Sequence, residues 1–327
     1  MDDLQLARES LIFTCEQGAL GLDDTRLSRA ARRGTLVRIK HGIYLDSALW
    51  ARLLSPDRHL LLATIADRVA GPGLVFSHQT AGALLGLPIL GRWPDRAHVL
   101  RDCADGGRST TVLCSHNLGL QGVPIGTAGG LTVTAPPRTV IDLARTLPFM
   151  AAVAATDAAL WADRRTGRFL TTIDDVRALL DQMDLIRGLR RVLAVLDAST
   201  PLCESVGETL CRLIMAELGF AAPQLQVRFD DAEGLVGFAD FSWLDRRVIA
   251  EFDGLKKYTD ARLRHGLTES EVVVAEKLRD DRLRALNYKV VRVIWDHLKD
   301  PARLQRMLLD AGLVQVRPAR VIRRDWF

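Results

Sequence analysis

The segment GFADFSWLDRRVIAEFDGLKKY at 237–258 contains two largely apolar runs, and Asp240, Glu251 and Asp253 interrupt them. Two runs typical of β-strands flank a short polar turn at 244–247. A turn of two or four residues places Asp240 directly opposite Glu251, and the alternation of side chains turns Asp253 to the same face. The spacing therefore predicts that these three carboxylates meet in one small volume.

Like charges at such spacing need compensation. Two carboxylates about 4 Å apart repel by ~4 kcal/mol at an effective dielectric of about 20, and a divalent cation removes that repulsion. Oxygen ligands favour Mg²⁺ or Mn²⁺, and such an ion can orient a water and polarise a phosphodiester. We expect Asp240, Glu251 and Asp253 to be the metal ligands, with Lys256 or Lys257 stabilising the developing charge.

The alternative is that the acids lie on a solvated strand edge. Their neighbours on both strands are apolar, namely Phe238, Phe241, Val248, Ile249 and Phe252. The acids therefore interrupt sequence that is expected to be buried, which favours a site over a solvated edge.

Residues 202–312 resemble the very-short-patch-repair-related branch of the PD-(D/E)xK nuclease superfamily. The segments that carry the resemblance are Ser205-Val-Gly-Glu208, Asp240-Phe-Ser-Trp243, Glu251-Phe-Asp253-Gly254-Leu-Lys-Lys257-Tyr258 and Glu276-Lys277-Leu-Arg279-Asp-Asp281-Arg-Leu283. The resemblance implies a Mg²⁺- or Mn²⁺-dependent DNA endonuclease. It also implies metal binding by Asp240 and Glu251, with Glu208 as the acid on the preceding helix.

The sequence departs from the family's ExK pattern, because Asp253 stands where the family carries lysine. Lys257 or Lys277 is the candidate replacement, with Arg279 as a further accessory residue. The loss of that lysine also fits a domain that binds DNA without cutting it.

Simpler structural roles stand beside the catalytic ones. Ser205 and Glu208 have the spacing of a helix capping box, and Lys277 with Asp281 has that of an i, i+4 surface pair. Arg279 is either solvated or a phosphate contact.

The N-terminal region has a basic pattern. An amphipathic helix is predicted over 4–17, a second within 21–34, and a hairpin over 36–45 that turns at residues 41–42. This is the order of a winged helix-turn-helix, which reads DNA with its second helix. We expect Arg26 and Arg29 near base edges, and as phosphate contacts Arg33, Arg38 and Lys40. The alternative is an ordinary solvated arginine face.

Residues 1–160 resemble the type IV abortive-infection antitoxin family. The segments that carry the resemblance are RLSRAARRGTLVRIKHGIYL (26–45), SHQTAGALLGLP (77–88) and TVTAPPRTVIDLAR (132–145). The resemblance implies a winged helix that binds promoter DNA and a second domain linked to neutralisation of a cognate toxin. His78 and Arg138 lie in these segments, but we expect neither to be catalytic. Metal-ligand spacing is absent from His59, His98, His116, His265 and His297.

Length and pattern together predict an α/β multidomain (α+β) architecture. The chain has 327 residues, of which 48% are hydrophobic and 26% charged, and it is too long for one average domain. We predict a winged helix-turn-helix at 1–50, an antitoxin-like α/β domain at 51–160, a helical linker at 161–200, and a PD-(D/E)xK-like mixed sheet flanked by helices at 201–327.

Hydrophobic periodicity and turn residues place the individual elements. Helices are predicted at 56–70, throughout 149–199, and at 204–218, 270–286 and 301–311. Strands are predicted at 97–100, 110–114, 131–134, 224–230, 235–243, 247–253 and 288–294.

Several classes of protein are disfavoured. The five cysteines include no CxxC pair, and no apolar run approaches 18 residues, so we expect a cytoplasmic protein with reduced thiols and no membrane partner. P-loop, GxGxxG and GxSxG motifs are absent, which disfavours a metabolic enzyme. Two hypotheses stand: an endonuclease delivered to DNA by a winged helix, and an antitoxin-like regulator with an inactive nuclease-like domain. The sequence specifies no oligomeric state.

Overall fold

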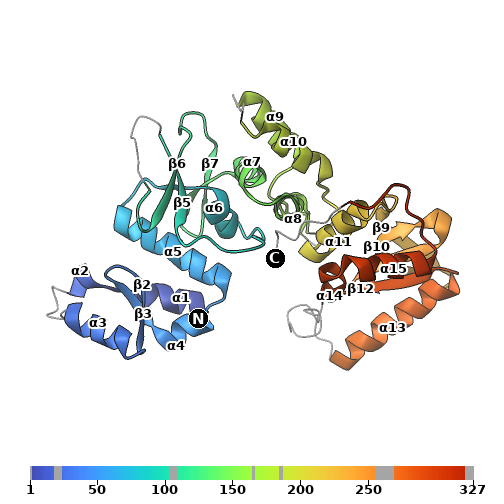
Figure 1. Cartoon of the computed structure of the whole chain (residues 1–327), viewed down its shortest axis with the longest axis horizontal. Coiled ribbons are helices and arrows are strands. Elements are labelled where there is room, and N and C mark those ends of the chain that lie inside the picture. The colour runs from blue at the N-terminus through green and yellow to red at the C-terminus, as the bar shows by residue number, and fades with distance from the viewer. Residues whose placement is uncertain are drawn as a thin grey trace. The chain divides into compact units, whose positions relative to one another are not determined.

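The computed structural model describes residues 2–17, 24–102, 109–163, 166–183, 187–254 and 269–320. The chain forms two compact units. The first comprises the chain up to Leu147 together with Thr171–Val192, and the second comprises Pro148–Leu170 and the chain from Leu193. Helices combine with three separate sheets, so the predicted mixed α/β fold class is confirmed (Figure 1). The predicted division into four domains stays a prediction.

The N-terminal module has the element order of a winged helix-turn-helix. Its elements are α1 (Asp3–Glu9), β1 (Ile12–Phe13), α2 (Thr14–Gln17), α3 (Asp24–Arg32), β2 (Leu36–Lys40), β3 (Ile43–Asp46) and α4 (Ser47–Arg52). The three strands pair in the order β1-β3-β2. The hairpin turns at His41 and Gly42 as predicted, and Gly42 has a φ of 71°, which glycine adopts without steric cost.

The prediction of one continuous helix over 4–17 is wrong. α1 ends at Glu9, and Phe13 pairs with Ile43 of β3. Phe13 is only 3% exposed. A long-range strand pairing that buries an aromatic ring outweighs the local helical period, because propensity is a weak preference that tertiary packing overrides.

The rest of the first unit surrounds a five-stranded sheet in the order β6-β5-β4-β8-β7. The strands are β4 (Val75–Phe76), β5 (Ala97–Arg101), β6 (Leu113–Asn117), β7 (Ile125–Ala128) and β8 (Leu131–Thr134). The helices are α5 (Ser55–Ala70), α6 (His78–Leu84), α7 (Pro136–Thr146) and α9 (Ile173–Gln182). One apolar core joins the winged helix, α5 and this sheet. The strand predicted at 110–114 lies three residues later, and β4 and β7 were not predicted.

The second unit is built on a four-stranded mixed sheet in the order β12-β11-β10-β9. The strands are β9 (Gln224–Asp231), β10 (Gly234–Trp243), β11 (Val248–Phe252) and β12 (Lys289–Val293). The helices are α8 (Phe149–Leu160), α11 (Val206–Glu217), α13 (Glu269–Ala285), α14 (Trp295–Lys299) and α15 (Pro301–Ala311). β12 runs parallel to β11, and the other neighbours are antiparallel. This confirms the predicted mixed sheet, and each strand bound lies within one residue of its prediction.

The stretch 149–199, predicted to be helical throughout, contains three helices, α8, α9 and α10 (Leu189–Ala198). Thr172 begins α9 with a capping box that includes Asp175. The sequence thus carries a helix start inside this stretch, which its high content of alanine and leucine concealed. Within the described ranges, no helix combines the length and apolar character needed to cross a bilayer.

Candidate nucleic-acid interface and carboxylate cavity

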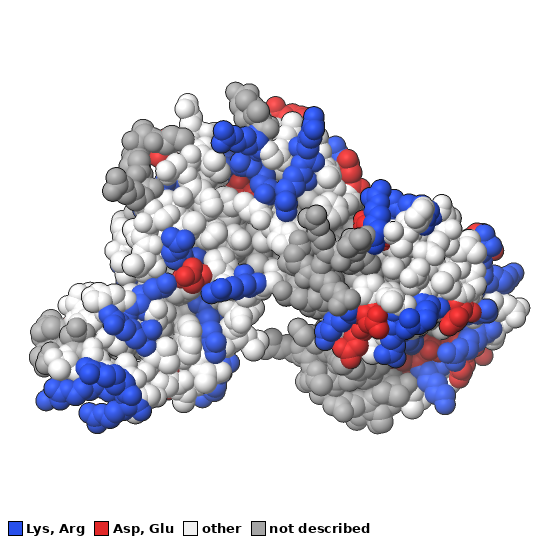
Figure 2. Space-filling model, in the orientation of Figure 1, with Lys and Arg blue, Asp and Glu red and all other residues white. Residues whose placement is uncertain are grey.

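α3 presents a row of arginines at its surface. Leu27 is 8% exposed and anchors the helix to the module. Arg26, Arg29 and Arg32 are exposed on the helix, and Arg33 follows directly after its end. Figure 2 shows Lys and Arg gathered over this part of the N-terminal module. The face predicted to meet DNA is therefore solvent-accessible and strongly basic.

The hairpin of β2 and β3, which is the wing of this module, contributes less accessible charge than the sequence predicts. The register of β2 is irregular between Arg38 and Lys40, and Ile39 packs against the core. Arg38 is exposed and contacts Nδ1 of His41. Lys40 Nζ donates to the backbone carbonyl of Asp95 at 2.7 Å. Arg38 thus stays at the surface, whereas the ammonium of Lys40 is held by the segment that contains Asp95.

The predicted register of the acidic hairpin is confirmed. Phe241 of β10 pairs with Ala250 of β11 across a four-residue turn. The next step of this register places Asp240 opposite Glu251. Asp240 Oδ2 accepts a hydrogen bond from the backbone N–H of Phe252 at 2.8 Å, so its carboxylate is fixed against the edge of β11.

α11 brings Glu208 beside Asp240. Ser205 caps the helix by accepting the backbone N–H of Glu208, and its hydroxyl donates to Glu208 Oε1 at 2.7 Å. Gln226 Nε2 donates to Glu208 Oε2 at 3.5 Å and to Asp240 Oδ1 at 3.3 Å. Burial, together with the charge of Asp240, raises the pKa of Glu208 to about 7. Glu208 is therefore both a capping residue and a neighbour of Asp240, and Gln226, which the sequence analysis missed, bridges the two acids.

Two arginines contact Glu251, which is 4% exposed. Arg279 Nη2 lies 2.7 Å from Glu251 Oε1, and Arg279 Nη1 donates to Oε2 at 3.0 Å. Arg292 Nη2 lies 3.6 Å from the same Oε2. Burial raises the pKa of Glu251 in spite of the two guanidiniums. The compensation that clustered carboxylates need is supplied here by the protein's own side chains.

A cavity of ≈ 210 Å³ opens at these residues. Its lining residues are Glu204, Gln226, Phe238, Asp240, Glu251, Phe252, Glu276, Arg279 and Arg292. Two of the predicted metal ligands, Asp240 and Glu251, thus share one small space. The third, Asp253, lies 3.9 Å from Arg292 Nη1.

Asp240, Glu251 and Asp253 do not bring three ligand atoms within 4.8 Å of one another in this structure. Among the described residues, the one group of three potential ligand atoms that lie within 4.8 Å of one another belongs to the first unit. Metal binding by Asp240, Glu251 and Asp253 stays a prediction. Arg279 and Arg292 already place positive charge beside Glu251.

The predicted accessory residues separate into two groups. Lys256 and Lys257 lie outside the described residues. Lys277 is exposed on α13. Arg279, which was expected to be solvated or to contact phosphate, instead pairs with Glu251 and donates to the carbonyl of Phe238 at 2.7 Å.

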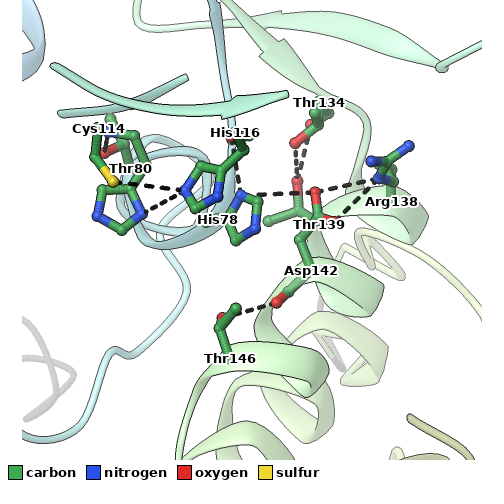
Figure 3. A network of polar contacts seen from close by, with 11 residues as sticks. His78, Thr80, Cys114, His116, Thr134, Arg138, Thr139, Asp142 and Thr146 are labelled. Carbon is green, nitrogen blue, oxygen red and sulfur yellow. Dashed lines mark hydrogen bonds and ion pairs between the residues drawn. The ribbon is translucent and has the colours of Figure 1, made fainter. Parts of the chain in front are cut away.

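The first unit contains a cluster that the sequence analysis missed. His98 of β5 pairs in register with Cys114 of β6, and His116 follows two residues later on the same strand face. One ligand atom from each of His98, Cys114 and His116 lies within 4.8 Å of the other two. Figure 3 shows Cys114 and His116 of this cluster. The prediction that the histidines lack metal-ligand spacing is wrong here, because two parallel strands set the spacing. The Cys-x-His alternation beside a predicted strand was the available signal.

His78 joins this cluster from the start of α6. Its ring stacks on that of His116, with centroids 3.6 Å apart and 13° between the planes. Its Nδ1 lies 3.0 Å from Ser77 Oγ and 3.9 Å from Asp142 Oδ2. Burial lowers the pKa of His78 and of His116, and burial with the neighbouring His116 lowers the pKa of His98 to about 4. The three imidazoles are therefore neutral at pH 7.

Comparison with known proteins bears on the N-terminal module. Residues 4–45 match the family described as transcriptional regulator, AbiEi antitoxin. Two uncharacterized proteins of Mycobacterium tuberculosis, from strains CDC 1551 and H37Rv, are each 28% identical over 286 residues, which covers 85% of this chain and 93% of each relative. The family match coincides with the winged helix-turn-helix and supports a DNA-binding regulator. The N-terminal segment of this chain is thus similar to a family of antitoxin-type transcriptional regulators.

Proposed function

We propose that this protein is an antitoxin-type transcriptional regulator that binds duplex DNA through α3 of its winged helix-turn-helix. The observation that carries the proposal is that the family match at 4–45 coincides with an exposed arginine surface on α3. The second helix of a helix-turn-helix enters the major groove and meets base edges with its N-terminal residues. Arginine suits both tasks there, because its guanidinium pairs with guanine edges and with phosphates.

The position of each arginine sets its role in this proposal. Arg26 and Arg29 lie in the first two turns of α3 and meet base edges. Arg33, after the helix, and Arg38, on the wing, contact the phosphates that flank the groove. Lys40 positions the wing instead, because its ammonium is bonded to the carbonyl of Asp95.

The test is binding of the full chain to a labelled duplex that carries the DNA upstream of its own gene, measured at 50 to 200 mM salt. Affinity should fall steeply with salt, with a log–log slope of about −0.9 for each neutralised phosphate. Arg26→Ala with Arg29→Ala should weaken binding at least about tenfold, since each base contact contributes about 1–3 kcal/mol.

A matched control is Arg303→Ala with Arg306→Ala, because these arginines have the same i, i+3 spacing and are exposed on α15. The control variant should bind like the unchanged chain. Equal loss in both double variants, or no loss in the α3 variant, would contradict the proposal.

A second candidate function is hydrolysis of DNA phosphodiesters with Mg²⁺ or Mn²⁺. It is favoured by one observation, namely that Asp240 and Glu251 line the same cavity while Gln226 links Asp240 to Glu208. The pairing of Glu251 with Arg279 favours the opposite outcome, a nuclease-like domain that does not cut.

Plasmid cleavage with either metal separates these two outcomes. Cleavage that is lost in Asp240→Ala and kept in Asp245→Ala, an exposed acid of the same hairpin, supports hydrolysis. Absence of cutting by the unchanged chain with both metals rules hydrolysis out and leaves the regulator.

We also propose a cognate toxin as protein partner, because the matched family is described as an antitoxin. The full chain should co-purify with the product of a neighbouring open reading frame that is toxic when expressed alone. If every neighbouring gene product can be expressed alone without growth arrest, the proposal of a cognate toxin is contradicted.

A further inference from the structure

We propose that His98, Cys114 and His116 form a zinc site on the five-stranded sheet of the first unit. This site is independent of the proposed DNA-binding surface and of the carboxylate cavity.

Two of the three donor separations are already close to those that zinc requires. Zinc binds imidazole nitrogen at roughly 2.0–2.1 Å and thiolate sulfur at roughly 2.3 Å in tetrahedral geometry, which places nitrogen donors roughly 3.3 Å apart and nitrogen roughly 3.6 Å from sulfur. His116 Nε2 lies 3.2 Å from His98 Nδ1 and 4.0 Å from Cys114 Sγ. These two separations lie within about 0.4 Å of the zinc values, and all three donors lie within 4.8 Å of one another.

Strand pairing, a hydrogen bond and ring stacking hold the donor residues in place. His98 and Cys114 occupy paired positions on two neighbouring parallel strands, so their Cα atoms are fixed by the sheet. The backbone N–H of His98 donates to Thr80 Oγ1 at 2.8 Å. The ring of His78 stacks on His116 and limits its rotation (Figure 3). Donors held by rigid strands and by packing lose little entropy when an ion binds.

The donor set selects the ion. Two imidazoles and one thiolate favour zinc over Mg²⁺ or Ca²⁺, which prefer oxygen ligands. The ring nitrogens of His98 and His116 and the thiol of Cys114 are the donors, and any proton that these atoms carry leaves to solvent as the bonds to zinc form. Three protein ligands leave the fourth tetrahedral position for water or another ligand. All three donors are partly exposed, so an ion can reach them from solvent.

The experiment uses the full reduced chain, freed of metal by a chelator and desalted, with Co²⁺ and Zn²⁺ as probes. Co²⁺ should bind in a one-to-one ratio, with the visible bands of a tetrahedral site and a sulfur-to-cobalt charge-transfer band. Zn²⁺ should then displace it and abolish both signals.

Single-residue variants decide whether the signal comes from this cluster. Cys114→Ser should remove the charge-transfer band and weaken Zn²⁺ binding more than about tenfold, and His116→Ala should weaken it by at least as much. Cys15→Ser and His41→Ala, which change an exposed thiol and an exposed imidazole, should leave both signals unchanged.

Zinc affinity and a cobalt spectrum that are unchanged in Cys114→Ser would overturn the proposal, as would the absence of one-to-one binding by the unchanged chain. Cys114→Ser changes one atom in a strand and keeps its size, so it decides the question even if His116→Ala fails to fold.

Discussion

At the scale of single residues, charge compensation sets the character of the carboxylate cavity. A buried carboxylate beside other acids needs a cation, and Glu251 receives two guanidiniums from α13 and β12. Arg292 also lies 2.7 Å from Asp280 and 3.8 Å from Glu276. The cavity is thus part of an alternating network of acids and arginines, which can stabilise the fold without any catalytic role.

We expect Glu251→Ala to lower the free energy of unfolding by about 1–3 kcal/mol, because two partly buried guanidiniums lose their shared carboxylate. Urea unfolding of the full chain measures this change. The control Glu233→Ala, whose side chain is 82% exposed, should change stability by less than about 0.5 kcal/mol. If the two variants lose the same free energy of unfolding, the pairing of Glu251 with the arginines does not stabilise the fold.

Glu208 makes the stability of the chain depend on pH. Its pKa rises from 4.5 to about 7 on folding, through burial and through Asp240, while Ser205 and the backbone of Glu204 oppose the rise. The folded state therefore holds more protons than the unfolded state between these values. The contribution of protonated Glu208 to the stability of the fold is fully present below pH 4.5 and is lost as the pH rises to about 7.

The measurement is melting temperature against pH for the unchanged chain and for Glu208→Gln. Glutamine keeps the size and the capping position of Glu208 but carries no proton that titrates. The variant should show a smaller fall between pH 4.5 and 7 than the unchanged chain. Parallel profiles would show that Glu208 does not titrate in this window.

The sequence could place residues that are positioned by a local turn, but not residues that are brought together by packing between distant elements. Asp240 and Glu251 were placed correctly because the parity of one short turn fixes their register. Arg279 comes from a helix and Arg292 from a strand later in the chain, so their approach depends on packing that no local pattern encodes. The same holds for His98 and Cys114, which meet only through the pairing of β5 with β6.

At the scale of elements, the approach of α11 to β11 positions Glu208. A Cβ atom at Gly207 would lie 1.9 Å from the ring of Phe252. That ring is held in turn against Trp295, with centroids 5.3 Å apart and planes at 88°. Only glycine permits this close contact, and the contact sets the distance between Glu208 and Asp240.

We expect Gly207→Ala to destabilise the chain by about 1–3 kcal/mol, because Phe252 must move away from its packed position. The shift of the urea unfolding midpoint of the full chain measures this loss of stability. Gly126→Ala is the matched control, since a Cβ there meets nothing within 4 Å, and it should stay within about 0.5 kcal/mol. A change at Gly207 no larger than that at Gly126 would contradict the close packing.

Elements could be predicted where one local pattern dominates. The strands of the second unit alternate or run apolar between clear turns, and each was placed within one residue. β1 and β4 have two residues each, which is too short for any period to show. They exist because longer strands pair with them, as Phe13 does with Ile43.

At the scale of the whole molecule, the winged helix is part of a larger folding unit. Its buried residues share one apolar core with α5 and the five-stranded sheet. Leu61 of α5 is 0% exposed within that core. The predicted boundary near residue 50 stays a prediction, and the segments on either side of it share one apolar core.

We expect Leu61→Ala to destabilise the first unit by about 2–5 kcal/mol through the cavity it leaves. Hydrogen exchange should show amides of β3 and β5 losing protection by the same factor, because both belong to one cooperative core. Loss confined to β5, with β3 unchanged, would mean that the winged helix unfolds independently.

Sequence discrimination by α3 tests the central claim most directly. The measurement is the ratio of dissociation constants for the chain's own upstream duplex and for a shuffled duplex of equal composition, at one physiological salt concentration. The unchanged chain should prefer its own duplex by at least about 10³-fold. Arg26→Ala with Arg29→Ala should lose most of this ratio while binding the shuffled duplex within about tenfold of the unchanged chain, since the remaining arginines still meet phosphates. A chain that binds both duplexes equally, or a double variant that keeps the full ratio, would contradict the assignment of α3 as the reading helix.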